Sequence, residues 1–165
     1  MSKEKAPRPG ELIIQTKSTE IVIPSQIPLI GTEINQRRFK KIVSFCRNRR
    51  NKYYPDDAGP HTRTTEAIKE AAEAIYQRFF LPPDEATIKV RAFSEVELSP
   101  GARVDCVILG QFGVILVETK PSRVSSFNQL AKYKEIWQEI FPEIPVLALR
   151  ASYRGNKILL LKRNH

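Results

Sequence analysis

Two carboxylates and one amine stand at the ends of two apolar segments in the second half of the chain. Asp105 lies in residues 103–109, and Glu118 and Lys120 end residues 113–120. Both segments are rich in Val, Ile and Leu, which predicts two buried strands joined by a tight turn. Because residues i and i+2 of a strand share a face, Glu118 and Lys120 point the same way. A hairpin would bring Asp105 level with them.

This combination suits the hydrolysis of a phosphodiester. Two carboxylates provide oxygen ligands for Mg²⁺, which polarises the phosphodiester and lowers the pKa of a bound water. A lysine beside the metal can orient that water or stabilise the charge of the transition state. The alternative is that Glu118 and Lys120 form an ion pair at the end of a strand, because charged groups inside a sheet are costly unless they are paired.

The order and spacing of these residues resemble the signature of the PD-(D/E)xK nuclease superfamily. Asp105 is followed, after an interval that the superfamily tolerates, by Glu118, Thr119 and Lys120. Val104 stands where the name-giving Pro would be, and that Pro is often absent. The resemblance implies that Asp105, Glu118 and the Thr119 carbonyl bind Mg²⁺, for which Mn²⁺ can substitute, and that Lys120 is catalytic.

A second motif follows in the next segment. Gln129 and Tyr133 resemble the Gln-x-x-x-Tyr motif of the RecB-like branch of the superfamily, in which both side chains face the site and its DNA. At this spacing they lie on one face of a helix. Gln129 could instead form a capping box with Ser126, and Tyr133 could equally pack in the core.

The resemblance also implies one more acid from the helix that precedes the first core strand. Glu66 is the candidate, although an acid in the first turn also complements the helix dipole. Glu95 and Glu97 share a face of the following strand by parity. Either could approach Asp105 after the turn at 99–101, but a solvent-facing edge is the expected position of both. His61 is expected to belong to the start of the helix rather than to act as a catalytic base.

The predicted fold is α/β, with a central mixed sheet of four or five strands flanked by helices on both faces. The resemblance implies a restriction-endonuclease-like αβββαβ core over residues 63–165, preceded by an N-terminal β/helix extension over residues 1–62. The crossover through the helix after Lys120 favours a mixed sheet. The expected elements are strands at 11–16, 20–24, 88–93 (extended through 96), 103–109, 113–120, 145–150 and 157–161, and helices at 33–48, 63–80 and 126–141.

Positive charge is concentrated in the expected helix at 33–48, which Thr32 would cap, and in the residues just after it. Residues 33–52 hold eight basic residues and one acid, in a chain of formal net charge +9, and Tyr53 and Tyr54 follow. Basic side chains beside aromatic ones suit a nucleic-acid backbone and its unstacked bases, whereas the alternative is a solvated charged face. The residues expected to bind nucleic acid are Arg37, Arg38, Lys41, Arg49, Arg50 and Arg123.

The lengths of the apolar runs and the spacing of the cysteines limit the classes of protein that fit this chain. No apolar run approaches the roughly 20 residues that span a bilayer, and Cys46 and Cys106 lack the spacing of metal ligands and are expected as buried thiols. We therefore expect an intracellular, metal-dependent DNA nuclease without a membrane segment, and a homodimer is one way for so small a nuclease to cut both strands. The alternatives are a non-catalytic nucleic-acid-binding module on the same fold and a basic structural protein.

Overall fold

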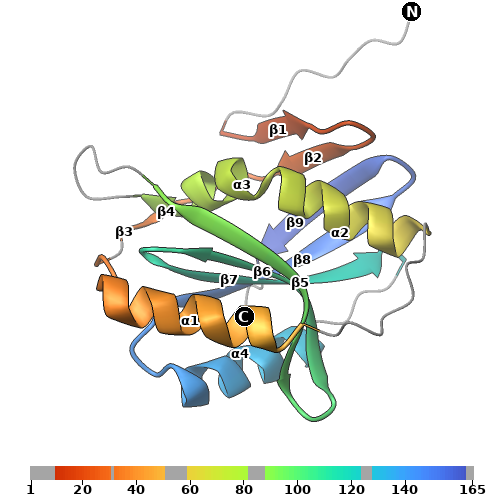
Figure 1. Cartoon of the computed structure of the whole chain (residues 1–165). Helices are drawn as coiled ribbons and strands as arrows, with labels where there is room; N and C mark the ends of the chain where they lie inside the picture. The colour runs from red at the N-terminus through yellow and green to blue at the C-terminus, as the bar shows by residue number, and fades with distance from the viewer. Residues whose placement is uncertain (1–9, 31, 51–58, 82–87, 124–127, 163–165) are drawn as a thin grey trace, which may run out of the picture.

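The computed structural model describes residues 10–30, 32–50, 59–81, 88–123 and 128–162, and a mixed sheet flanked by helices lies at its centre (Figure 1). The strands are β1 (Leu12–Gln15), β2 (Glu20–Ile23), β3 (Leu29–Ile30), β4 (Phe80–Leu81), β5 (Val90–Ser99), β6 (Ala102–Gly110), β7 (Gly113–Pro121), β8 (Val146–Arg154) and β9 (Lys157–Lys162). The helices are α1 (Gln36–Asn48), α2 (Pro60–Glu70), α3 (Ala72–Phe79) and α4 (Asn128–Ile140).

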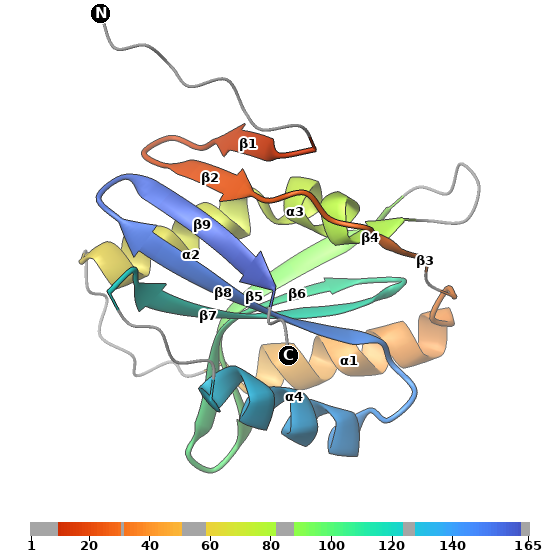
Figure 2. The same cartoon turned by 180° about the vertical axis from the view of Figure 1, so that it is seen from behind.

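The main sheet has seven strands in the order β1-β2-β9-β8-β7-β6-β5. β5, β6 and β7 pair antiparallel, and the crossover through α4 makes β8 parallel to β7. The mixed sheet is therefore confirmed. The expected count of four or five strands was wrong, because β2 pairs in parallel with β9 and β1 extends the sheet further (Figure 2). This pairing covers the backbone groups that β9 would otherwise expose as an edge.

Helices cover both faces of the sheet, with α2 and α3 on one face and α1 and α4 on the other (Figures 1 and 2). Successive residues of a strand point to opposite faces, so Val107 packs in the cluster with α1 and α4 and Ile108 in the cluster with α2 and α3. Both faces are thus buried, which explains the continuous apolar runs of β6 and β7.

The thiols of Cys46 and Cys106 are buried as expected, and burial raises the pKa of each to about 12.

Three helix boundaries differ from the expected ones. The single helix expected at 63–80 is two helices that meet at Ala71, and the first of them begins at Pro60, because proline is well suited to the first turn of a helix. The predicted division between residues 62 and 63 therefore falls inside α2. α1 is capped by Asn35 rather than Thr32, with the Arg38 N–H donating to Asn35 Oδ1 at 2.8 Å.

None of the helices in the described ranges is both long and apolar enough to span a bilayer.

Candidate active site

The ladder between β6 and β7 ends just before the two carboxylates. Its last pair is Cys106 with Val117, so Asp105 and Glu118 come next on their strands but lie outside the ladder. Both are buried, with 5 % and 7 % of their surface exposed. The Thr119 N–H donates to Asp105 Oδ2 at 2.7 Å. The Asp105 side chain therefore bonds the backbone of β7 where the ladder between β6 and β7 ends.

The neighbouring strand β5 is also irregular at this level. Its ladder with β6 includes the residues on either side of Glu95 but omits the pair of Glu95 with Asp105. Glu95 has φ 55° and is the one residue other than glycine with a positive φ in the described ranges. Such a conformation persists only when the surroundings hold it, and Arg103 Nε lies 2.8 Å from Glu95 Oε2.

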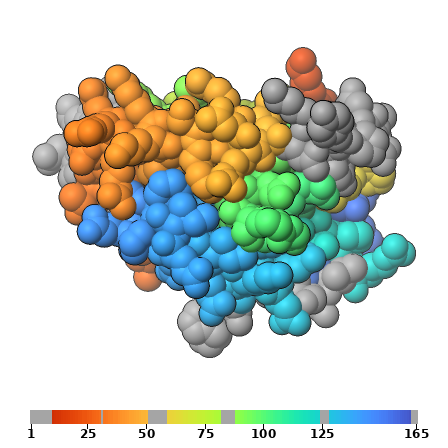
Figure 3. Space-filling view, turned by 60° about the horizontal axis from the view of Figure 1, so that its bottom comes forward, coloured from red at the N-terminus to blue at the C-terminus, as the bar shows by residue number. Residues whose placement is uncertain are grey.

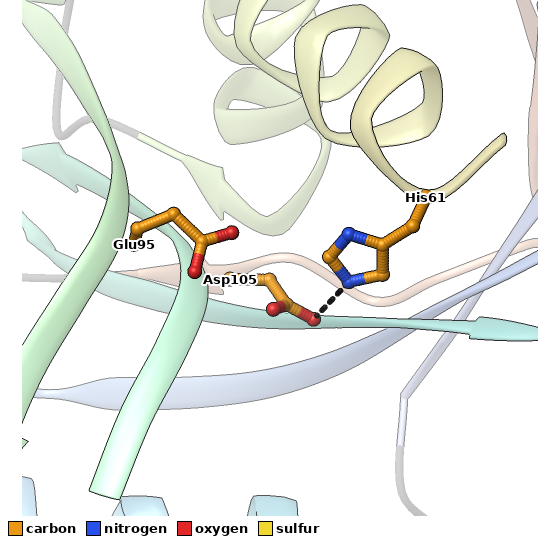
Figure 4. Close-up of side chains that lie close together, drawn as sticks. All are labelled: His61, Glu95 and Asp105. Carbon is orange, nitrogen blue, oxygen red and sulfur yellow. Dashed lines mark ion pairs between the residues drawn. The ribbon is translucent and has the colours of Figure 1, made fainter. Parts of the chain in front are cut away.

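The favoured expectation that Glu95 faces solvent was wrong, and the alternative, an approach to Asp105, is what the structure has. The positive φ of Glu95 takes its side chain out of the regular alternation of the strand. Its side chain is 12 % exposed, and its carboxylate points toward Asp105 (Figure 4). Burial, and then the charge of Asp105, raise the pKa of Glu95. Glu97 keeps the expected exposed position.

His61 reaches the same carboxylate from the other side of the site (Figure 4). It lies in the first turn of α2, as expected, but its Nε2 is 3.2 Å from Asp105 Oδ2. The hydrogen bond to Asp105 raises the pKa of His61. One turn later, Thr65 Oγ1 lies 3.4 Å from Thr119 Oγ1, which holds the start of α2 against β7. The sequence signal for this placement was Pro60, which favours a helix start one residue before His61.

Glu118 has one carboxylate oxygen that is buried without a hydrogen-bond donor among the described residues. Lys120 Nζ lies 3.7 Å from Glu118 Oε1, so the ion pair considered from the sequence is present. Glu118 Oε2 is nevertheless buried, and no hydrogen-bond donor of the described residues reaches it. Burial, and then the charge of Asp105, raise the pKa of Glu118 to about 9. One lysine therefore does not offset the repulsion between the two carboxylates.

One cavity of about 450 Å³ lies at the site, and Glu95 is not among its lining residues. From α4, Gln129 and Tyr133 reach it as expected, Gln129 from an exposed position and Tyr133 from a buried one. Burial, and then the charge of Glu118, raise the pKa of Tyr133 to about 12. The other lining residues are His61, Glu97, Gly101, Ala102, Arg103, Asp105, Glu118 and Lys120.

Glu66 does not join this group. Its side chain is 62 % exposed and its Oε1 lies 3.9 Å from Lys69 Nζ. Because α2 begins at Pro60 rather than at residue 63, Glu66 falls in the second turn of the helix and faces solvent. His61, in the first turn, is the residue that α2 contributes to the cavity.

The C-terminal end of α1 approaches the cavity. The Arg49 carbonyl accepts the Glu97 N–H at 2.9 Å, and Arg50 forms a β-bridge with Val96. Arg49 also lies over the Phe45 ring, 4.6 Å from its centroid. Figure 3 shows α1 and α4 side by side, with the end of the β5–β6 hairpin against both. The basic helix thus ends next to a strand whose Glu97 lines the cavity.

The other basic residues expected to bind nucleic acid have different surroundings. Arg37 and Lys41 are exposed on α1, and Arg123 is exposed just after β7. Arg38 is half-buried, with its Nη1 3.8 Å from a carboxylate oxygen of Glu143. The residues singled out at 53, 54 and 126 lie outside the described ranges.

The chain matched none of the protein families, curated proteins or solved structures with which it was compared. The chemistry of the site follows from its donors. Asp105 lies in two clusters of possible metal ligands. In the first, ligand atoms of Asp105, His61 and Glu95 all lie within 4.8 Å of one another. In the second, Asp105 is next to Glu118. Carboxylate oxygens are ligands for Mg²⁺ and Mn²⁺, and an imidazole nitrogen favours transition metals. The buried, unbonded Glu118 Oε2 is an acceptor that such a cation would satisfy.

Proposed function

We propose that this protein is a metal-dependent DNA nuclease with a restriction-endonuclease-like core, similar to the RecB-like branch of the PD-(D/E)xK superfamily. The observation that carries the proposal is Glu118 Oε2, which is buried without a donor beside Asp105 in a cavity that also contains Lys120. Two adjacent buried carboxylates repel each other, and a divalent cation between them removes that repulsion. The order α2/α3, β5–β6–β7, α4, β8 supports the αβββαβ core.

In this proposal Asp105, Glu118 and the Thr119 carbonyl hold Mg²⁺ or Mn²⁺, and His61 and Glu95 complete the site around Asp105. Bound there, the metal supplies a Lewis acid that polarises the phosphodiester and lowers the pKa of a water molecule. Hydrolysis adds water across the P–O bond and leaves a 5′-phosphate, as the resemblance implies.

The remaining groups of the cavity orient the reactants. Lys120 places a positive charge beside Glu118, where it orients the attacking water or stabilises the negative charge of the transition state. With a pKa of about 12, Tyr133 remains a phenol near neutral pH and can donate a hydrogen bond to a phosphate oxygen. Gln129, exposed at the cavity, can bind the DNA backbone.

The test is cleavage of supercoiled plasmid, linear duplex and single-stranded DNA with Mg²⁺, with Mn²⁺ and with EDTA. We expect metal-dependent cleavage that Glu118→Gln abolishes. Glu70→Gln is the matched control, because Glu70 is an exposed acid of α2 that does not line the cavity. If both strands are cut by a homodimer, linear plasmid appears without accumulation of the nicked form, and sedimentation in the same buffer gives a mass of two chains.

Two outcomes would contradict the proposal. Tight, salt-sensitive DNA binding without cleavage under any metal would indicate the non-catalytic binding module, which the basic helix α1 also favours. Neither cleavage nor DNA binding would mean that Glu118 and Lys120 form an ion pair of purely structural character.

A further inference from the structure

A second cavity, of about 600 Å³, forms a groove between α1 and β5. None of its lining residues lines the candidate active site. Four of them are basic, Lys40 and Arg47 from α1 and Lys89 and Arg91 from β5 and the residues just before it, and Glu33 is the acid among them. The groove therefore has a net positive lining.

The secondary structure places the four cations on two facing walls. Lys40 and Arg47 are seven residues apart, and this spacing puts them on one stripe of a helix. Lys89 and Arg91 are two residues apart and share a face of the strand with Phe93, which is buried in the cluster under α1. All four basic side chains belong to exposed residues, so their charges are available to a ligand.

The two walls are held in register at one end by Gln111, in the turn between β6 and β7. The Lys89 N–H donates to Gln111 Oε1 at 2.6 Å, and the Ile34 N–H donates to the Gln111 carbonyl at 2.6 Å. At the other end, the Glu97 N–H donates to the Arg49 carbonyl. α1 and β5 therefore run in the same direction, and the spacing between the walls is fixed at both ends.

No ion pair within the described ranges neutralises any of the four cations. Arg91 lies over the ring of Phe93 at 5.6 Å from its centroid, a contact that attracts the guanidinium but does not neutralise its charge. Four cations on opposite walls with no acid paired to them repel one another. A polyanion in the groove would offset that repulsion and release the small anions that screen it.

Both walls lead from the groove to the candidate active site. β5 carries Arg91 and, four residues later, Glu95. At a rise of about 3.3 Å per residue, Lys89 lies about 20 Å along the strand from Glu95, a length equal to about six base pairs of duplex at 3.4 Å each. The groove therefore runs along β5 toward the cavity, and its α1 wall ends at Arg49, whose carbonyl accepts the N–H of Glu97, a residue of the cavity lining.

We propose that the groove between α1 and β5 binds the phosphate backbone of the DNA on one side of the bond that is cut. This inference rests on the proposed nuclease function for the identity of the ligand. It assigns the binding surface to Lys40, Arg47, Lys89 and Arg91, on two elements, and none of these four is among the six residues expected from the sequence. An acidic peptide would satisfy the same charges, but the groove ends beside Glu97 of the cavity, and this position favours the substrate itself.

The test is fluorescence anisotropy of a labelled DNA duplex of about 20 base pairs, titrated with protein in EDTA so that no cleavage occurs. The double variant Arg47→Gln/Arg91→Gln removes one charge from each wall, and Lys40→Gln/Lys89→Gln repeats the test with the other pair. The control is Arg154→Gln/Lys157→Gln, which removes two exposed charges at the β8–β9 turn, outside the groove.

Each groove variant is expected to weaken DNA binding by about tenfold or more, with the control within about twofold of the wild type. Each should also reduce the slope of log K against log salt concentration by about 1.8, or about 0.9 for each lost phosphate contact. Equal weakening by groove and control variants would overturn the proposal, because net charge alone would then explain binding. Competition by a glutamate-rich peptide that binds more tightly than DNA would overturn it in favour of an acidic protein partner.

Cleavage assays separate this inference from the function on which it rests. A wild-type protein that binds DNA through the groove but cuts nothing with Mg²⁺ or Mn²⁺ would contradict the nuclease and leave the groove as a DNA-binding surface. A wild-type protein that cuts DNA while the groove variants bind it normally would contradict the groove alone.

Discussion

The Glu118→Gln variant tests whether the site is built for a cation. Without a divalent metal, burial and Asp105 raise the pKa of Glu118 from 4.5 to about 9. Between these values the folded protein holds a proton that the unfolded chain releases. The free energy of unfolding therefore falls as pH rises from 4.5 through 9. Glutamine keeps the shape of the protonated acid without this proton.

The expected magnitude follows from the pKa. At pH 7 the wild type must protonate a group whose unfolded pKa is 4.5, which at 1.36 kcal/mol per pH unit costs about 3 kcal/mol. Glu118→Gln avoids that cost, so it should be more stable than the wild type by about 3 kcal/mol at pH 7 and equally stable near pH 4. For a chain of this size the melting temperature would rise by roughly 6–12 °C.

The assay is urea unfolding of both proteins between pH 4 and 9 in EDTA, repeated with Mg²⁺ and with Mn²⁺. Metal should stabilise the wild type more as pH rises and stabilise Glu118→Gln less, because only the wild type has the Glu118 carboxylate whose proton competes with the cation. A variant that is less stable than the wild type at pH 7 in EDTA would refute the reasoning. In that case the Glu118–Lys120 ion pair stabilises the fold.

Three further substitutions have distinct expected results. Lys120→Ala should reduce cleavage by about 10²-fold or more while DNA affinity in EDTA changes little, and loss of both would exclude the assigned role. His61→Gln should weaken Mn²⁺ binding by about tenfold and Mg²⁺ binding less, measured by calorimetry, since nitrogen ligands favour transition metals. Tyr76→Phe should lower the free energy of unfolding by about 2–4 kcal/mol, because the Tyr76 hydroxyl donates to the Gly113 carbonyl and accepts from the Phe112 N–H. A loss below about 1 kcal/mol in urea would contradict that account.

Elements that depend on local pattern were predictable. β6 and β7 are apolar on both faces, so their continuous runs of Val, Ile and Leu mark them in any context. The crossover through α4 predicted a mixed sheet, and the structure has one. The pairing of β2 with β9 was not predictable, because it joins distant segments whose local sequences do not encode a partner.

The candidate site also has residues whose placement was predictable from local pattern and residues whose placement was not. Glu118 and Lys120 are two residues apart on one strand, and Gln129 and Tyr133 are one turn apart on one helix. The period of the backbone alone therefore puts each pair on one face, and all four line the cavity. Glu66 was expected at the site because the resemblance implies an acid from that helix, but its position depends on where α2 begins, and that start was assigned three residues too late.

The amino-acid sequence by itself determined which side chains share a strand or helix face, because that depends only on the repeat of the backbone. Tertiary structure alone decided that His61 and Glu95 meet at Asp105. His61 reaches it because α2 packs on β6 and β7, and Glu95 because its backbone takes a positive φ that strand parity does not anticipate. α2, β5 and β6 meet at the Asp105 carboxylate because of long-range packing. The same packing stabilises the positive φ of Glu95, which glutamate does not favour by itself.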